Sequence, residues 1–210
     1  MKAVDSMKLL SLASNFSGEH RAKHSVFLAY LYPFSKAMLD SGDLTSRMDS
    51  LKREHKNARH IVSALRVLHS GGILESSSDA KEPRGSAGRP MLEVLSGQGM
   101  IEVLCICVRY FGGVKLGVGG LARAYARAAM NALDEARALD GIVEYVPMDD
   151  LLVCGPIGSY SKLRNLIKSL GVAVIDEEFL ESNFRLALRG DASILSALKP
   201  SLHSFGVVEV

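Results

Sequence analysis

The stretch from Arg109 to Arg127, RYFGGVKLGVGGLARAYAR, constrains the fold of this chain more than any other segment. Before it, the short apolar run at residues 103–108 (VLCICV) predicts a buried strand. After it, apolar residues, many of them alanines, recur at helical spacing from Leu121 to Leu139, which predicts a long helix packed closely on a sheet. The sequence therefore predicts a strand, a glycine-rich turn and a helix in succession.

The glycine-rich turn and the helix after it are basic, since residues 103–133 contain four basic side chains and no acidic one. A helix N-terminus exposes unpaired N–H groups and a partial positive charge, and glycines let a ligand approach the backbone. The segment matches neither a P-loop nor a dinucleotide fingerprint. We predict a surface for anions, most obviously phosphate, while tight turns beside a solvated helix face are the alternative. The predicted residues are Arg109, Gly112, Gly113, Lys115, Gly117, Gly119, Gly120, Arg123 and Arg127.

A polar loop predicted at residues 70–89 leads to a second helix start of the same kind. Loops of this length are uncommon in compact domains and tend to be functional or disordered. This one ends in glycines and in Pro90, which suits the first turn of a helix, directly before an apolar run. The repeated arrangement adds Ser78, Glu82, Gly85 and Arg89 to the predicted anion surface, with a solvated loop tip as the alternative.

Length and composition indicate a globular protein without membrane spans. The chain has 210 residues, 48% of them hydrophobic and 23% charged, enough for one large or two small domains. No apolar run approaches the roughly 18 residues that a bilayer requires, and the first twenty residues lack a signal-peptide pattern, so we expect a cytoplasmic protein. The net charge of +2 is too small to indicate nucleic-acid binding by itself.

The three cysteines do not form a metal-binding pattern. Cys105 and Cys107 lie on the same side of the predicted strand, where they are most simply small core residues. Cys154 is distant, and no Cys or His pair stands at ligand spacing. We therefore expect neither a metal nor a cofactor.

The first part of the chain mixes strands and a helix. Residues 8–17 and 24–32 are predicted to form an antiparallel hairpin around the polar residues 18–23. Residues 44–56 have the spacing of an amphipathic helix. Residues 60–68 are a predicted strand, in which Ser63 and Arg66 suggest one partly buried face.

The pattern changes at Pro147, so we divide the chain into domains at 1–146 and 147–210. In the second domain, strands are predicted at residues 151–153, 172–179, 184–188 and 205–210, and helices at 160–170 and 194–202. The order β-α-β-β-α-β is that of a ferredoxin-like module. Its predicted core contains Leu163, Ile167, Phe184, Leu186, Leu198 and Leu202.

Four motifs resemble the IMPACT/YigZ family along nearly the whole chain. They are KHSVFLAY, EHKNARH, SSDAKEPRGSAGRPML and VRYFGGVKLGVGGLARAY. The chain departs from the family pattern at Ala80 and Lys81, where SSDDGEP is common, and at Val108, where threonine is usual.

The resemblance implies an α+β protein of two domains. The N-terminal mixed α/β domain is expected to be like domain IV of elongation factor G, and the ferredoxin-like C-terminal domain like domain V. The family's eukaryotic members are similar to regulators of translation that restrain a stress-responsive initiation-factor kinase. No catalytic residue is established in the family, so none is carried over.

The favoured function is a non-catalytic, translation-associated module that binds RNA, the ribosome or a translation-regulatory protein. Phosphate contacts from the basic residues would confer affinity without sequence specificity, so no DNA specificity is expected. Tyr110 and Phe111, which follow a buried strand, are expected in the core rather than stacked on bases.

Two other functions remain open on the sequence. One is an enzyme or binding protein for a small phosphorylated ligand, with Asp79, Glu82 or His60 as acid or base. The other is a protein-interaction scaffold that uses the exposed sheet face of the second domain. An enclosed pocket would favour the first of these, whereas a flat basic stripe would favour RNA.

Overall fold

The computed structural model describes residues 9–69 and 72–209 and divides the chain into two compact units. Unit 1 is Met1–Tyr145 and unit 2 is Val146–Val210, one residue from the division expected at Pro147. Among the described residues, no helix is both long and apolar enough to span a membrane.

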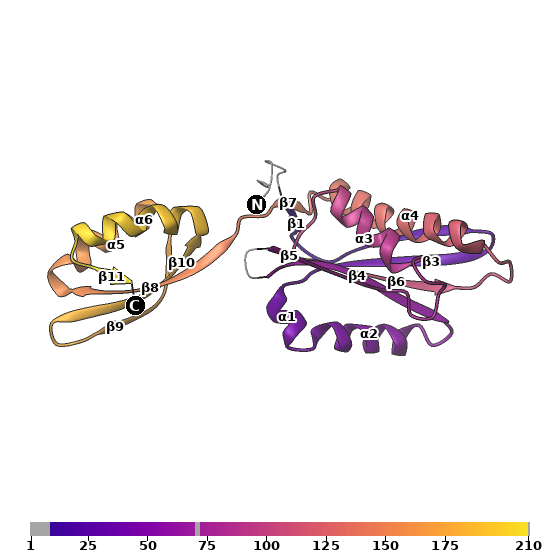
Figure 1. Cartoon of the computed structure of the whole chain (residues 1–210), viewed down its shortest axis with the longest axis horizontal. Coiled ribbons are helices and arrows are strands. Elements are labelled where there is room, and N and C mark those ends of the chain that lie inside the picture. The colour runs from indigo at the N-terminus through magenta and orange to yellow at the C-terminus, as the bar shows by residue number, and fades with distance from the viewer. Residues whose placement is uncertain (1–8, 70–71, 210) are drawn as a thin grey trace. The chain divides into compact units, whose positions relative to one another are not determined.

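Unit 1 is built on a five-stranded antiparallel sheet with the order β2-β3-β6-β4-β5 (Figure 1). The strands are β2 (Phe16–Ala22), β3 (Ser25–Pro33), β4 (His60–His69), β5 (Gly72–Ser78) and β6 (Val103–Tyr110). Seven consecutive residues of β6, from Val103, are buried, so the predicted buried strand is confirmed at the centre of the sheet. A separate pair joins β1 (Leu10–Leu12) to β7 (Ile142–Glu144).

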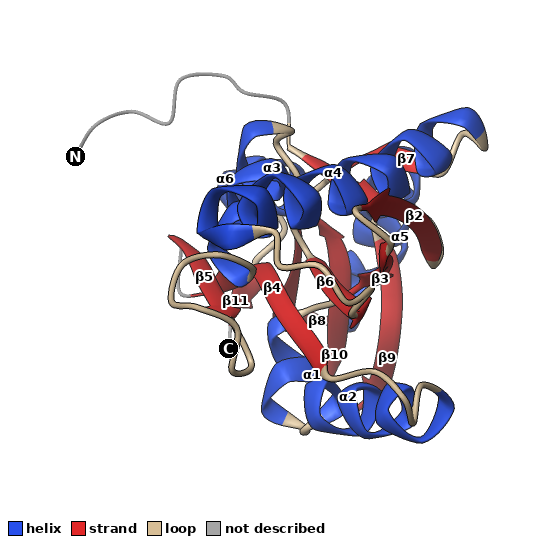
Figure 2. Ribbon diagram, turned by 90° about the vertical axis from the view of Figure 1, so that its right-hand side faces the viewer, coloured by secondary structure: helices blue, strands red, loops and turns tan. Residues whose placement is uncertain are grey.

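Helices cover both faces of this sheet (Figures 1 and 2). On one face lie α3 (Gly88–Gly97) and α4 (Gly117–Ala138), and on the other lie α1 (Lys36–Asp40) and α2 (Asp43–Glu54). The alanine face of α4 is buried, which confirms the predicted helix. It packs so closely on β2 that a Cβ at Gly18 would overlap the backbone of Ala132. Small side chains therefore fix the distance between helix and sheet.

The N-terminal hairpin differs from its prediction. The turn between β2 and β3 is formed by Lys23 and His24, both with positive φ, and residues 18–22 belong to a strand rather than to a connection. Because β2 is an edge strand with alternating exposure, its polar residues read as a loop in the sequence. Residue 8 of the predicted first strand lies outside the described residues.

Two predictions for the middle of unit 1 are also wrong. Residues 72–78 of the loop predicted at 70–89 form the edge strand β5, whose exposed serines lack the apolar alternation of a strand, and residues 88–89 already belong to α3. Ser70 and Gly71 lie outside the described residues. Seven consecutive residues of β4 are buried, so the strand is covered on both faces. Arg66 can be buried there because it pairs with Glu75 at 2.8 Å and donates to the Met100 carbonyl at 2.6 Å.

Unit 2 has the predicted β-α-β-β-α-β order, with strands arranged β11-β8-β10-β9, all antiparallel. Its elements are β8 (Met148–Pro156), the 3-10 turn Ile157–Ser159, α5 (Tyr160–Ser169), β9 (Ala173–Phe179), β10 (Asn183–Asp191), α6 (Ala192–Ser204) and β11 (Val208–Glu209). All six predicted core residues are buried. Val210, at the end of the predicted last strand, lies outside the described residues.

Cys105 and Cys107 lie in the core of unit 1, as predicted. Both are free thiols without accessible surface. Burial raises the pKa of Cys105 to about 12, so this thiol is protonated at neutral pH. Their role is to fill space between the sheet and the helices above it.

Candidate functional site

The start of α4 carries no cap from a side chain. Leu116 occupies the N-cap position, and the first turn contains no acidic residue. Gly113 and Gly117 adopt φ of +86° and +70°, which favours glycine, and a Cβ at Gly112 would overlap the backbone of His24. These glycines therefore shape the loop, and they leave a helix N-terminus without an acid of its own.

A buried ion pair lies beside this helix start. Arg109 Nη1 donates to Glu82 Oε1 at 2.7 Å, and the Tyr125 hydroxyl donates to the same oxygen at 2.8 Å. The His60 Nδ1 atom is 3.9 Å from it. Burial, followed by the nearby Cys107 and Glu82, raises the pKa of Tyr125 well above its ordinary value, so its hydroxyl remains a proton donor.

Arg109 is therefore not an exposed cation, contrary to its predicted place on a basic surface. Only 5% of its surface is accessible, and its charge is balanced by Glu82. Its guanidinium lies 5.5 Å from the ring centroid of Phe27 and 5.4 Å from that of Phe111. Its Nε atom is the one buried side-chain nitrogen or oxygen of the described residues that has no hydrogen-bond partner.

A cavity of about 450 Å³ opens above the Glu82–Arg109 pair, and we call it the α4 cavity. Its polar lining is Arg59, His60, Glu82, Arg109 and Lys115, and the rest is Pro83, Phe111, Leu116, Gly117, Val118 and Leu121. Phe111 is 40% exposed here, so its expected core position is wrong. Tyr110 is half-buried and its hydroxyl lies 2.7 Å from His55 Nδ1.

Arg123 and Arg127 line a different hollow, of about 440 Å³, which shares Leu116 with the α4 cavity. Lys23 and His20 from the β2–β3 hairpin join them, and no acidic residue lines the hollow. Both arginines and Lys23 are exposed and have no carboxylate partner among residues 9–69 and 72–209. We call this set of four residues the α4 basic face.

The start of α3 is closed, in contrast to its predicted role. The Asp79 carboxylate accepts from the amides of Gly85 (2.7 Å), Ala87 (3.1 Å) and Gly88 (2.9 Å). Partial burial opposes ionisation of Asp79, but these hydrogen bonds outweigh it and hold its pKa below the ordinary value. The amides of Gly85, Ala87 and Gly88 are therefore not available to an external anion.

The other predicted residues near α3 are also not brought to the α4 cavity. Arg89 pairs with Glu93 at 2.9 Å, and Ser78 is exposed at the end of β5. Of the four residues predicted from this loop for the anion surface, Glu82 alone lines the α4 cavity; His60, the acid or base of the enzyme alternative, lines it too, whereas Asp79 does not. Gly119 and Gly120 lie in the first turn of α4, where Gly120 faces Leu116 and lines the hollow of the α4 basic face.

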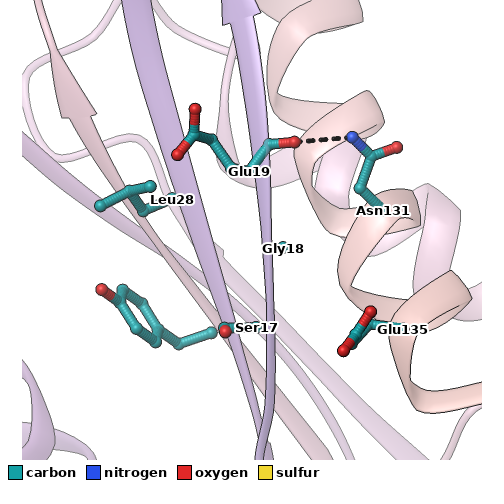
Figure 3. A pocket seen from close by; sticks show the side chains of 7 residues that line it. Ser17, Gly18, Glu19, Leu28, Asn131 and Glu135 are labelled. Atoms are coloured by element: carbon teal, nitrogen blue, oxygen red, sulfur yellow. Dashed lines mark hydrogen bonds between the residues drawn. The ribbon is translucent and has the colours of Figure 1, made fainter. Parts of the chain in front are cut away.

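A third cavity, of about 410 Å³, lies where β2 meets the later turns of α4 (Figure 3). Asn131 donates to the Glu19 carbonyl across it at 2.7 Å, which fastens the helix to the edge strand. Glu19 and Glu135 are its charged residues, so it does not suit an anion. One turn beyond Arg127, the uncharged Asn131 occupies the same side of α4 and binds β2, so the α4 basic face does not extend into this cavity.

Sequence reasoning missed Lys23, Arg59, Tyr125 and Val118 as parts of these sites. Lys23 and Arg59 lie far from the glycine-rich stretch in sequence, and no local pattern connects them to it. Tyr125 had a signal, since it is the one large polar-tipped side chain on the alanine face of the predicted helix. In the described part of the chain, no group of three His, Cys, Asp or Glu residues could hold a metal ion.

Comparison with known proteins places the chain in a family. The Impact N-terminal domain matches residues 23–133, which include β3 to β6, α3 and most of α4. The chain is 39% identical over 97 residues to the IMPACT family member YvyE of Bacillus subtilis strain 168, covering 46% of this chain and 42% of that protein. It is 41% identical over 91 residues to the IMPACT family member YigZ of Escherichia coli K12, covering 41% and 43%.

These alignments span less than half the length of either relative. A crystal structure of a hypothetical protein matches with a TM-score of 0.66 and covers 97% of each chain. Its sequence identity is 24%, so the match shows a shared α+β fold and no more.

Proposed function

We propose, because the chain belongs to the family defined by the Impact N-terminal domain, that it is a non-catalytic, translation-associated module that binds RNA through the α4 basic face. The ribosome is the RNA-rich partner that fits the link to translation implied by the family resemblance. The binding we propose is to phosphates and carries no base specificity.

The observation that supports this proposal is that the charges of the α4 basic face are not neutralised within the fold. Arg123 and Arg127 stand one turn apart on α4, and Lys23 approaches them from the hairpin. Most arginines elsewhere in unit 1 are paired with carboxylates, as Arg47 is with Asp43. Exposed cations without partners suit the closely spaced phosphates of a nucleic acid.

We also propose that the two units correspond to the elongation factor G domains that the resemblance implies. Unit 1 would be of the domain IV type and unit 2, with its β-α-β-β-α-β order and β11-β8-β10-β9 sheet, a ferredoxin-like domain of the domain V type. This correspondence supports a ribosomal partner over free RNA. It assigns no activity, because fold alone does not determine function.

The test is the salt dependence of RNA binding. In the double variant Arg123→Gln/Arg127→Gln, the slope of log K against log salt for a uridine homopolymer should fall by roughly 1.4, because about two phosphate contacts are lost. Stability should change by no more than about 0.5 kcal/mol, since both side chains are exposed. Fluorescence anisotropy at several salt concentrations and a thermal melt measure the two quantities.

The control is Lys52→Gln/Arg53→Gln on α2, which removes two exposed positive charges, one of them paired with Asp49 at 2.8 Å, from the opposite face of the sheet. Its slope should equal that of the unaltered protein. An Arg123→Gln/Arg127→Gln variant with an unchanged slope contradicts RNA binding at this face and leaves a protein partner as the alternative.

A further inference from the structure

The α4 cavity has features of a ligand site that RNA binding at the α4 basic face does not use. It is lined by other residues, and Leu116 is the one residue shared between the two. Its volume of about 450 Å³ lies within the roughly 300–1,000 Å³ typical of small-molecule sites. It also combines an apolar wall with a few convergent polar groups, as such sites do.

We propose that the α4 cavity binds a nucleoside monophosphate, either free or as the phosphorylated end of an RNA chain. The phosphate would lie at the open N-terminus of α4, and the base would lie against the apolar wall. The chemistry of each half follows from separate residues.

The charges of the cavity favour an anionic group. Glu82 and Arg109 neutralise each other, whereas Arg59 and Lys115 are exposed and have no carboxylate partner in the described part of the chain. The uncapped first turn of α4 adds N–H donors and a partial positive charge at Gly117 and Val118, which line the same cavity. Two exposed cations beside a helix start are suited to a phosphate monoester.

A second, independent observation indicates a missing partner. Arg109 lines the cavity with 5% of its surface accessible, and its Nε–H donor has no acceptor among the described residues. A buried donor without an acceptor costs free energy, so such groups are rare in folded proteins. The Nε atom itself is buried, so a ligand oxygen in the cavity would supply that acceptor only after a small rotation of the guanidinium.

The apolar wall favours a flat ring rather than phosphate alone. Phe111 and Val118 both line the cavity, and they are 40% and 56% exposed. The Arg109 guanidinium lies over the Phe111 ring at 5.4 Å, which holds the ring in position. A nucleobase stacked on Phe111 would cover this exposed apolar surface.

Isothermal titration calorimetry tests the proposal with five ligands. They are adenosine monophosphate, adenosine, inorganic phosphate, and a uridine oligonucleotide with and without a 5′-phosphate. Adenosine monophosphate should bind more tightly than adenosine and inorganic phosphate, because both halves of the site are then used. Tighter binding of the 5′-phosphorylated oligonucleotide than of the same oligonucleotide without that phosphate assigns the ligand to an RNA end, and equal binding of the two oligonucleotides assigns it to a free nucleotide. Both outcomes support the site.

Two variants separate the halves of the site. Lys115→Gln should raise the Kd of adenosine monophosphate about tenfold, as expected for one lost charge-assisted contact, and should leave adenosine binding unchanged. Phe111→Ala should weaken adenosine monophosphate and leave inorganic phosphate unchanged. Both side chains are exposed, so both variants should fold, and circular dichroism checks this.

The matched control is Arg123→Gln/Arg127→Gln, which should bind adenosine monophosphate as the unaltered protein does. The proposal is overturned if adenosine monophosphate does not bind, if it binds no better than inorganic phosphate, or if neither Lys115→Gln nor Phe111→Ala weakens it. These outcomes do not bear on the α4 basic face, whose residues are different.

Discussion

The starts of α3 and α4 look alike in the sequence and differ in the structure. Each follows a loop rich in glycine and basic residues. At α3, the amides of Ala87 and Gly88 donate to the Asp79 carboxylate, whereas the first turn of α4 has neither a capping side chain nor an acid. A helix start that holds its own carboxylate must expel it to bind another anion, and an open start need not.

The packing around the two starts differs in the same way. A Cβ at Gly88 would lie 2.8 Å from the Ser78 nitrogen and 3.0 Å from the Ser63 carbonyl oxygen, so α3 is pressed against β4 and β5. A Cβ at Gly119 would find no atom closer than 3.9 Å, that atom being on the Arg123 side chain. The α3 start is therefore a packing element, and the α4 start is a surface.

The largest effect is expected from removing the carboxylate that closes the α3 start. Asp79→Ala should destabilise the protein by about 2 to 3 kcal/mol, because three amides lose a charged acceptor. Asp79→Asn retains one acceptor oxygen and should lose less. Urea unfolding followed by circular dichroism measures both, and an Asp79→Ala protein as stable as the original would contradict the comparison.

The same carboxylate predicts a pH dependence. Since the folded-state pKa of Asp79 is lowered, its contribution is fully present above the ordinary Asp pKa of about 3.9 and is lost as the pH falls through the folded value. The stability difference between the original protein and Asp79→Ala should therefore be constant from about pH 5 upward and shrink below about pH 4.

The second prediction sets Gly88→Ala against Gly119→Ala. The first should destabilise the protein by about 1 to 3 kcal/mol, because the new Cβ meets backbone atoms that cannot move aside. The second should stabilise it by about 0.5 kcal/mol, since alanine favours a helix and the space is open. Melting temperatures of the two variants that shift in the same direction would show that the starts do not differ in packing.

The smallest effect concerns the turn that carries Asp79. Ala80 and Lys81 both have positive φ, 43° and 71°, and the Glu82 amide donates to the Asp79 carbonyl at 2.9 Å. These are the features of a turn in which glycine is preferred at the second central position. Lys81→Gly should therefore stabilise the protein by about 0.5 kcal/mol. This value is the backbone strain that glycine relieves minus the conformational entropy that it adds to the unfolded chain.

Lys81→Ala is the control, because it removes the charge and retains the strain. It should show no gain in melting temperature. A gain equal to that of Lys81→Gly would attribute the effect to the lysine charge rather than to the backbone.

Periodic segments with one clear apolar pattern were predictable from the sequence. Strand β6, helix α4 and the order of elements in unit 2 followed from runs of apolar residues at strand or helical spacing. The edge strands β2 and β5 were not, because an edge strand exposes much of its surface and tolerates Ser, Glu and His, as loops do.

For the candidate site, the sequence by itself determined a glycine-rich, acid-free helix start with exposed arginines, since spacing along one helix decides which residues share a face. Only the tertiary structure decided that Arg109 is buried against Glu82 and that Asp79 closes the α3 start. It also decided that Lys23 lines the hollow of the α4 basic face and that Arg59 lines the α4 cavity. The physical reason is that burial and ion pairing depend on contacts between segments distant in the chain, which no local pattern encodes.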